Sequence, residues 1–103
     1  MTTKTTLYIG ANDATTKTQI KTLDAQRDII TAICFDHVDG ATIYTGDGIY
    51  KHTDGGKINE KNTIVILYDA PQVTTLKIAD AIKHALNQES ILIEYASVKI
   101  DFI

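Results

Sequence analysis

Two segments with the apolar spacing of amphipathic helices enclose a pair of strand-like segments, and this order constrains the fold more than any other feature. The first helix is predicted over residues 23–38, with Thr22 as its N-cap and Asp39-Gly40 closing it. The second follows Asp69-Ala70-Pro71 and ends near Asn87. Between them, Ala41–His52 and Lys57–Tyr68 are predicted to pair antiparallel through the turn at residues 53–56.

One strand-like segment precedes this unit and one follows it. Thr5–Gly10 alternates apolar and polar residues. At the end of the chain Ser90–Tyr95 is followed by Val98–Phe102, which alternates in the same way. The order β-α-β-β-α-β predicts an α+β, ferredoxin-like two-layer sandwich with a C-terminal strand extension. Since no linker or repeat divides the sequence, we expect a single domain over residues 1–103.

Two strands carry apolar residues on both of their sides. The runs are Ile64–Tyr68 and Ile91–Ile93, whereas a sheet with one face in water alternates cleanly. Three readings stay open: the strand after Ala96 folds back over the second face, another chain covers it, or outward apolar residues of central strands carry no meaning. Of these we favour self-association as a homodimer.

The composition excludes several classes of protein. The chain has 103 residues, 44% hydrophobic, with a single cysteine and a formal charge of -3. The lone cysteine rules out an internal disulfide and indicates a reducing compartment. The charge offers no basic surface for nucleic acid, and no apolar run is long enough for a membrane helix. We therefore expect a cytoplasmic protein that binds neither membrane nor nucleic acid.

Several short motifs resemble a family of small bacterial and phage proteins known as a domain of unknown function. They are Leu7-Tyr8-Ile9-Gly10, the stretch from Asp39-Gly40-Ala41-Thr42-Ile43 through Gly46-Asp47-Gly48 to Tyr50, Asp54-Gly55, and Gln88-Glu89-Ser90-Ile91-Leu92. The likeness runs almost end to end. It implies the β-α-β-β-α-β fold. The small size, the Thr, Asn and Ile richness and the simple strand chemistry resemble a phage or prophage accessory protein in the cytoplasm of a bacterial host cell, and proteins of that kind often act by binding.

The thiol and two of the imidazoles give no catalytic arrangement. Cys34 lies late on the apolar stripe of the first helix, which predicts a packed core residue. His37 follows one turn later, but structural zinc needs four ligands and no second pair exists, so we expect no metal and no cofactor. His84 lies on the polar side of the second helix, which predicts a solvated role.

The candidate site lies on the first strand of the hairpin. Tyr44, Tyr50, Lys51 and His52 form the densest set of aromatic and polar groups that could bind a ligand or partner. Gly46-Asp47-Gly48 lies inside the same strand and predicts a β-bulge, which would move Tyr44 to the other side.

The sequence shows no recognisable pair of nucleophile and base, no paired carboxylates and no phosphate-binding loop. The first hypothesis is therefore a non-enzymatic phage or prophage accessory protein that binds a host protein. Its most concrete version is an inhibitor of a bacterial antiviral defence system, an anti-CRISPR or another anti-defence protein. The alternative is a small-molecule-binding dimeric α+β barrel protein, sequestering or catalytic. A pocket beside Tyr44, Tyr50 and His52 would favour this alternative, and a flat patch the first hypothesis.

Overall fold

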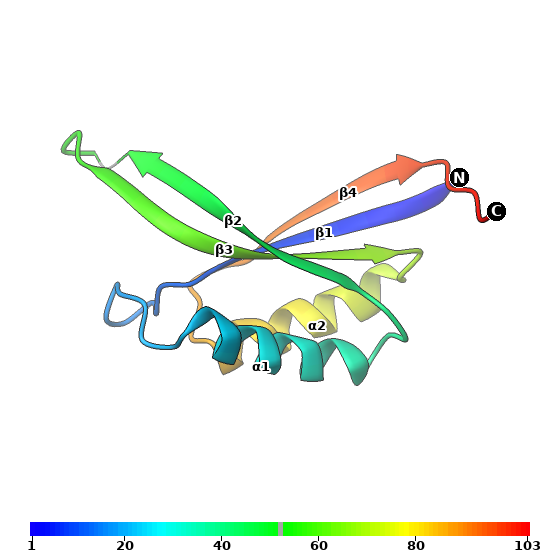
Figure 1. The fold of residues 1–103 in the computed structure, drawn as a ribbon, viewed down its shortest axis with the longest axis horizontal. Coiled ribbons are helices and arrows are strands. Elements are labelled where there is room, and N and C mark those ends of the chain that lie inside the picture. Colours follow the sequence, from blue (N-terminus) through cyan, green and yellow to red (C-terminus); the bar gives the residue numbers. More distant parts are fainter. Residues whose placement is uncertain (52) are drawn as a thin grey trace.

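The computed structural model of the chain describes residues 1–51 and 53–103. Figure 1 shows its six elements in chain order. They are β1 (Thr2–Gly10), α1 (Leu23–Phe35), β2 (Thr42–Lys51), β3 (Lys57–Tyr68), α2 (Gln72–Ala85) and β4 (Leu92–Val98). The α+β class and the β-α-β-β-α-β order predicted from the sequence are confirmed.

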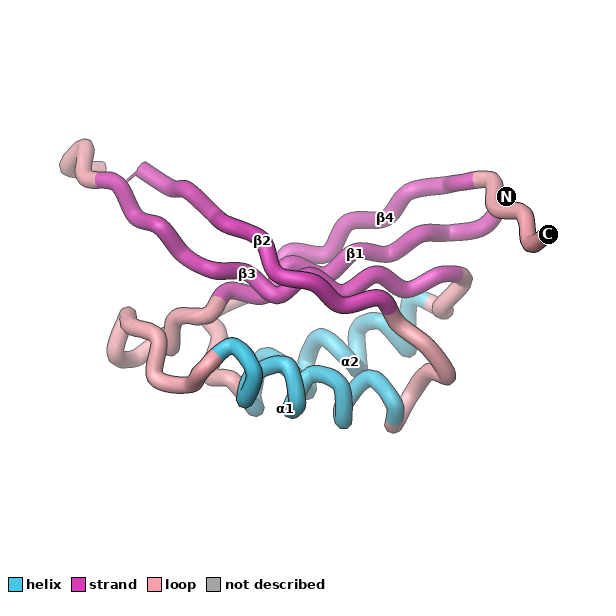
Figure 2. The backbone as a smooth tube through the Cα atoms, viewed as in Figure 1, coloured by secondary structure: helices cyan, strands magenta, loops and turns pink. Residues whose placement is uncertain are grey.

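The four strands form one antiparallel sheet in the order β2-β3-β1-β4. Both helices lie against the same face of this sheet, and we call the opposite side the open face (Figure 2). The β2–β3 hairpin continues beyond the helix layer at one end of the molecule, which is 47 Å long and about half as wide (Figure 1). The arrangement is the predicted ferredoxin-like two-layer sandwich.

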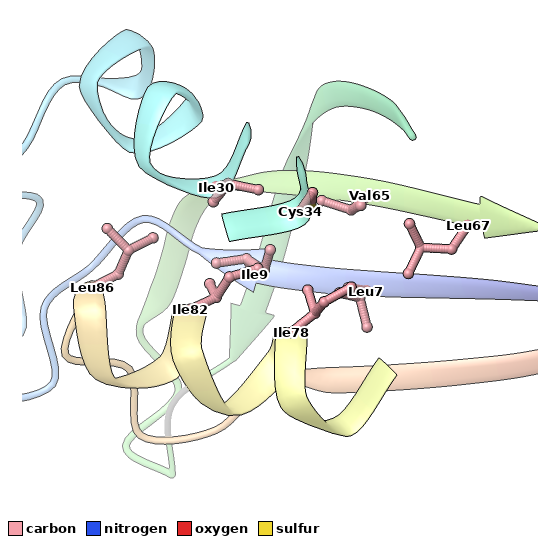
Figure 3. Close-up of a cluster of buried hydrophobic side chains, with 9 residues drawn as sticks. All are labelled: Leu7, Ile9, Ile30, Cys34, Val65, Leu67, Ile78, Ile82 and Leu86. Atoms are coloured by element: carbon pink, nitrogen blue, oxygen red, sulfur yellow. The ribbon is translucent and has the colours of Figure 1, made fainter. Parts of the chain in front are cut away.

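The hydrophobic core fills the space between the helices and the sheet (Figure 3). Alternate residues of β1 and β3 point to the helices, because successive side chains of a strand lie on opposite faces. Nine core side chains are less than a tenth exposed: Leu7, Ile9, Ile30, Cys34, Val65, Leu67, Ile78, Ile82 and Leu86. Within the part of the chain that is described, no helix has the length and apolar character needed to cross a membrane.

The helix boundaries follow local signals in the sequence. Thr22 is the N-cap of α1, as predicted, since its hydroxyl accepts a hydrogen bond from the Ala25 amide at 3.1 Å. Pro71 stands at the N-cap of α2, where its fixed φ and missing N–H cost nothing. Asn87 follows α2 with a left-handed φ of 46°, a conformation that asparagine tolerates better than most residues.

The end of α1 differs from the prediction. The helix stops at Phe35, and the Cys34 carbonyl then accepts the amides of His37 at 3.0 Å and Val38 at 2.9 Å. This turn closes the helix without a left-handed residue, so the predicted closure at Gly40, which has no positive φ, is wrong. Val38 still packs against the core, which explains why the apolar stripe runs past the helix end.

The predicted β-bulge in β2 is also wrong. The register is continuous, with Gly46 opposite Asn62 and Gly48 opposite Glu60. A Cβ atom on Gly48 would lie 2.8 Å from both the Asn62 side-chain nitrogen and the Tyr50 ring. The glycine therefore makes room for neighbouring side chains, and the uninterrupted strand keeps Tyr50 on the same side of β2 as Tyr44.

The C-terminal strand extension predicted over Val98–Phe102 is wrong as well, because β4 ends at Val98. Val98 pairs with Thr2, the first residue of β1, so β4 ends where its ladder with β1 ends. The Phe102 side chain is 95% exposed. The described residues after β4 thus leave the open face uncovered.

Cys34 is a core residue, as predicted: its side chain is 1% exposed, and burial raises the pKa of the thiol. Cys34→Ser should lower the free energy of unfolding by about 1–2 kcal/mol, because a hydroxyl replaces a thiol at an apolar site. Urea denaturation measures this loss. Labelling of the native protein should be slow at neutral pH, and rapid labelling would contradict the assignment.

Candidate functional site

A cavity of about 700 Å³ lies beside the β2–β3 hairpin, where β1 ends and the chain enters β4. This volume is in the usual range for small-molecule sites. Its walls come from the end of β1, the loop after it, the stem of the hairpin and the segment leading into β4. The lining residues are Tyr8, Gly10, Asn12, Asp13, Ala14, Lys17, Tyr50, Ile58, Glu60, Asn62, Gln88, Glu89, Ser90 and Leu92.

The half-buried carboxylate of Glu60 is held in place within this pocket. Its Oε2 accepts a hydrogen bond from the Asn12 amide at 2.9 Å, which ties β3 to the loop after β1. The carboxylate lies over Gly10, where an added Cβ atom would be only 2.6 Å from Oε2. The glycine at the end of β1 therefore provides the space that Glu60 occupies.

Two tyrosines of the open face border the pocket. The Tyr50 side chain lies back over Gly48, next to Asn62. The Tyr8 hydroxyl donates to Glu94 Oε1 at 3.2 Å, and burial raises the pKa of Tyr8, with Glu94 adding to the shift. Tyr8 therefore stays protonated at neutral pH. The pocket combines aromatic surface with a carboxylate, which suits a flat ligand that carries positive charge.

The loop and turn at the rim are held together by polar contacts. The Gln88 side chain donates to the Asn12 carbonyl at 2.9 Å, and the Asn87 side chain donates to the Asp13 carboxylate at 3.0 Å. Lys17 and Glu89 lie 3.9 Å apart on the outside, both well exposed. The rim is thus built from residues far apart in the sequence.

Among Tyr44, Tyr50 and Lys51, the predicted site residues that the structure describes, only Tyr50 lines the pocket. Tyr44 is on the open face, opposite Ile64 on β3 and away from the cavity. Lys51 follows Tyr50 and so points to the other side of β2. His52 lies outside the described residues.

The carboxylate and amide side chains of the pocket, above all Glu60 and Asn62, were not predicted from the sequence. A signal for them existed in β3. Glu60 and Asn62 have the same parity as Ile64 and Ile66, so one side of this strand changes from polar to apolar along its length. Such a change marks a strand that leaves its apolar surroundings at one end.

No metal centre is found among residues 1–51 and 53–103, since no three His, Cys, Asp or Glu side chains there are placed to hold an ion. The polar groups of the pocket are carboxylates, amides and phenols. They can bind and orient an organic ligand by hydrogen bonds, charge and stacking.

Comparison with solved structures finds the same fold in a phage SAM lyase in complex with S-methyl-5'-thioadenosine, at 20% identity and a TM-score of 0.64, over 92% of this chain and 80% of that one. The apo phage SAM lyase matches at 16% identity and a TM-score of 0.58, over 98% and 91%. A DUF3240 family protein from Shewanella baltica OS155 matches at 9% identity and a TM-score of 0.54, over 97% of this chain and 94% of that one. No curated protein matches the chain in sequence.

These neighbours correct one prediction. The expectation of a non-enzymatic protein is wrong, because the fold is one that a phage SAM lyase uses and is compatible with enzymatic activity. Fold alone does not assign a reaction. The sequence profile of the family described as "Protein of unknown function (DUF3574)" matches residues 4–102, in agreement with the predicted resemblance to such a family. The chain therefore belongs to the DUF3574 family.

Proposed function

We propose that the chain binds SAM, S-adenosylmethionine, in the pocket at Glu60 and cleaves it to S-methyl-5'-thioadenosine. The observation that carries the proposal is the carboxylate of Glu60, held by the Asn12 amide beside the tyrosines of the pocket. The fold shared with phage SAM lyase supports it. A cavity beside Tyr50 also favours the small-molecule alternative of the sequence analysis over protein binding.

The ligand matches the pocket group by group. SAM has a flat adenine ring, which can stack on a tyrosine, and two cations in its methionine part, a sulfonium and an ammonium. A half-buried carboxylate is the partner that such a cation needs. S-methyl-5'-thioadenosine keeps the adenine but has neither cation. The pocket should therefore bind the product through its aromatic part alone.

The cleavage needs no acid or base from the protein. The bond between sulfur and the γ-carbon of the methionine part breaks, and its electron pair goes to sulfur, which becomes a neutral thioether. The carboxylate of the same SAM molecule bonds to that carbon and closes a lactone, so atoms and charge balance without proton transfer. The protein contributes by holding the carboxylate near the carbon and by limiting access of water.

The phage neighbours also suggest the setting of this activity. A phage protein that consumed SAM in the bacterial cytoplasm would deprive host enzymes of their methyl donor. The anti-defence role expected from the sequence would then act through a metabolite. That role, and any host-protein partner, stay predictions.

Incubation of the purified protein with SAM tests the proposal, with products identified by mass spectrometry and binding of S-methyl-5'-thioadenosine measured by calorimetry. We expect the thioadenosine and homoserine lactone to form in equal amounts. Binding without turnover would reduce the proposal to sequestration and overturn the reaction. No binding of either compound at millimolar concentration would overturn both.

Gly10→Ala tests whether the position of Glu60 matters. The new methyl group would take the space of the Glu60 carboxylate, which can move aside at little cost because it is the end of a flexible side chain. SAM affinity should fall about tenfold, the loss of one displaced charge-assisted contact. Thermal unfolding should change little, and an unchanged affinity would contradict the role of Glu60.

The homodimer expected from the sequence is proposed to form through the open face. An apolar row crosses all four strands there, since Tyr44, Ile64, Tyr8 and Leu92 are successive cross-strand neighbours. Its ends are exposed, Tyr44 to 47% and Leu92 to 65%. A second copy that buries this row would remove apolar surface from water.

Light scattering on a size-exclusion column tests the dimer. The protein should elute at twice its monomer mass, and Leu92→Glu should shift it towards the monomer. Leu76→Glu is a matched control, because Leu76 is a half-exposed leucine of α2 on the helix side. A monomeric mass at high concentration would contradict the proposal.

A further inference from the structure

Asp13 closes a turn at the rim of the pocket. Its side chain is 8% exposed, and its Oδ1 accepts hydrogen bonds from the amides of Thr15 at 2.8 Å and Thr16 at 2.9 Å. Its Oδ2 accepts one from the Asn87 side chain at 3.0 Å. These hydrogen bonds hold the pKa of Asp13 below its ordinary value, and the bond from the Thr16 amide has the largest effect. The carboxylate is therefore charged at neutral pH and already bonded within the protein.

The residue before this turn connects it to the pocket carboxylate. The Asn12 amide donates to Glu60 Oε2 at 2.9 Å, and the Asn12 carbonyl accepts the Gln88 side chain at 2.9 Å. The Ala14 amide donates to the Asn87 carbonyl at 2.8 Å. The backbone at Asn12 is thus held on both sides, by the turn of Asp13 and by the segment after α2.

We propose that Asp13 is a positioning residue: by fixing the backbone of Asn12 it sets the place of the Glu60 carboxylate in the pocket. The expected effect on SAM affinity rests on the proposed function. The structural part does not, because Asp13 and Glu60 are joined through a single amide that can be observed directly. Asp13 itself acts on the ligand only through that amide.

Asp13→Ala removes the carboxylate that accepts three hydrogen bonds, from the Thr15 and Thr16 amides and the Asn87 side chain. The backbone of Asn12 should then be less restrained. In hydrogen-exchange NMR the Asn12 amide should lose about tenfold or more of its protection, while core amides such as that of Leu7 keep theirs. SAM affinity should fall about fivefold, because Glu60 loses a fixed position. A merely structural role would lower protection throughout the sheet instead.

Asp54→Ala is the matched control. The Asp54 carboxylate also closes a turn, by accepting the Gly56 amide at 2.8 Å, but it lies at the hairpin tip and does not line the pocket. This variant should leave both the Asn12 amide and the affinity for SAM unchanged. Equal effects of the two variants would overturn the specific role of Asp13.

A reciprocal exchange tests the contact itself. Asp13→Asn replaces the charged acceptor of the Asn87 side chain by a neutral amide and should weaken the link, because charge-assisted hydrogen bonds are stronger than neutral ones. Adding Asn87→Asp lets the introduced amide donate to the introduced carboxylate, so Asn12 protection should recover. Failure to recover, with both variants folded, would overturn the proposed role of this pair.

The outcomes separate this inference from the proposed function. If the wild-type protein binds no SAM, the proposed function fails. The positioning role is still tested, because the hydrogen-exchange protection of the Asn12 backbone amide in Asp13→Ala can be measured without a ligand. If Asp13→Ala weakens SAM binding but leaves Asn12 protection intact, Asp13 contacts the ligand directly and the inference is overturned.

Discussion

Glu60→Gln should weaken SAM binding by about thirtyfold, or about 2 kcal/mol. Two unit charges about 4 Å apart attract each other by about 4 kcal/mol at the effective dielectric constant near a protein surface. Glu60 is only half-buried, so solvent screens part of this attraction. About half of the 4 kcal/mol, or about 2 kcal/mol, is therefore expected to be lost with the charge. Glutamine has the same shape and can still accept the Asn12 amide, so the loss reports charge.

Three ligands measured by calorimetry separate the cations that Glu60 could meet. S-methyl-5'-thioadenosine has neither cation, S-adenosylhomocysteine has the ammonium alone, and SAM has both. Glu60→Gln should leave affinity for the thioadenosine almost unchanged. A loss for SAM and S-adenosylhomocysteine alike assigns the ammonium, and a loss for SAM alone assigns the sulfonium. Equal losses for all three would contradict a role through charge.

Ile82→Ala should lower the free energy of unfolding by about 3 kcal/mol. Ile82 is fully buried between α2 and the sheet, where it packs with the other core side chains (Figure 3). Truncation removes apolar contacts and leaves a cavity that the tightly packed core fills only in part. This loss is a large share of the about 5–15 kcal/mol that stabilises a typical domain.

Urea denaturation measures the loss, with Leu76→Ala as a control on the same helix. Leu76 is 50% exposed, so its truncation should change stability by less than about 0.5 kcal/mol. Similar losses for both variants would contradict the prediction that burial against the sheet decides the cost, because alanine is the better helix former at both positions. At temperatures where Ile82→Ala is folded, its SAM affinity should match that of the wild type.

Local signals were sufficient for the helices and for the pairing of the strands. Thr22, Pro71 and the turn at residues 53–56 act on their immediate neighbours, and the spacing of Ile78 and Ile82 follows the turn of a helix. Gly55 has the left-handed φ of 88° that this turn requires. Each feature depends on a few adjacent residues, which is why the sequence predicts it.

The errors lie where a residue far away in the sequence decides. Gly46 and Gly48 resemble a bulge by type, but the Ile64 side chain lies against Gly46, and Asn62 and the Tyr50 ring occupy the space at Gly48. The strand predicted after Val98 does not form: Val98 pairs with Thr2, the first residue of β1, and the β1–β4 ladder goes no further. Neither partner could be known before the register of the sheet.

The sequence by itself determined the order of the helices and strands, the apolar face of each helix and the place of Cys34 in the core. Apolar periodicity and helix capping depend only on residues that are close together in the chain. The pocket was decided by the tertiary structure alone. Asn12, Glu60 and Gln88 come from three separate segments, and a hydrogen bond between Asn12 and Glu60 spans 48 positions of the chain. Antiparallel pairing of β1 with β3 and β4 brings these segments to one end of the sheet, and no local pattern records which side chains meet there.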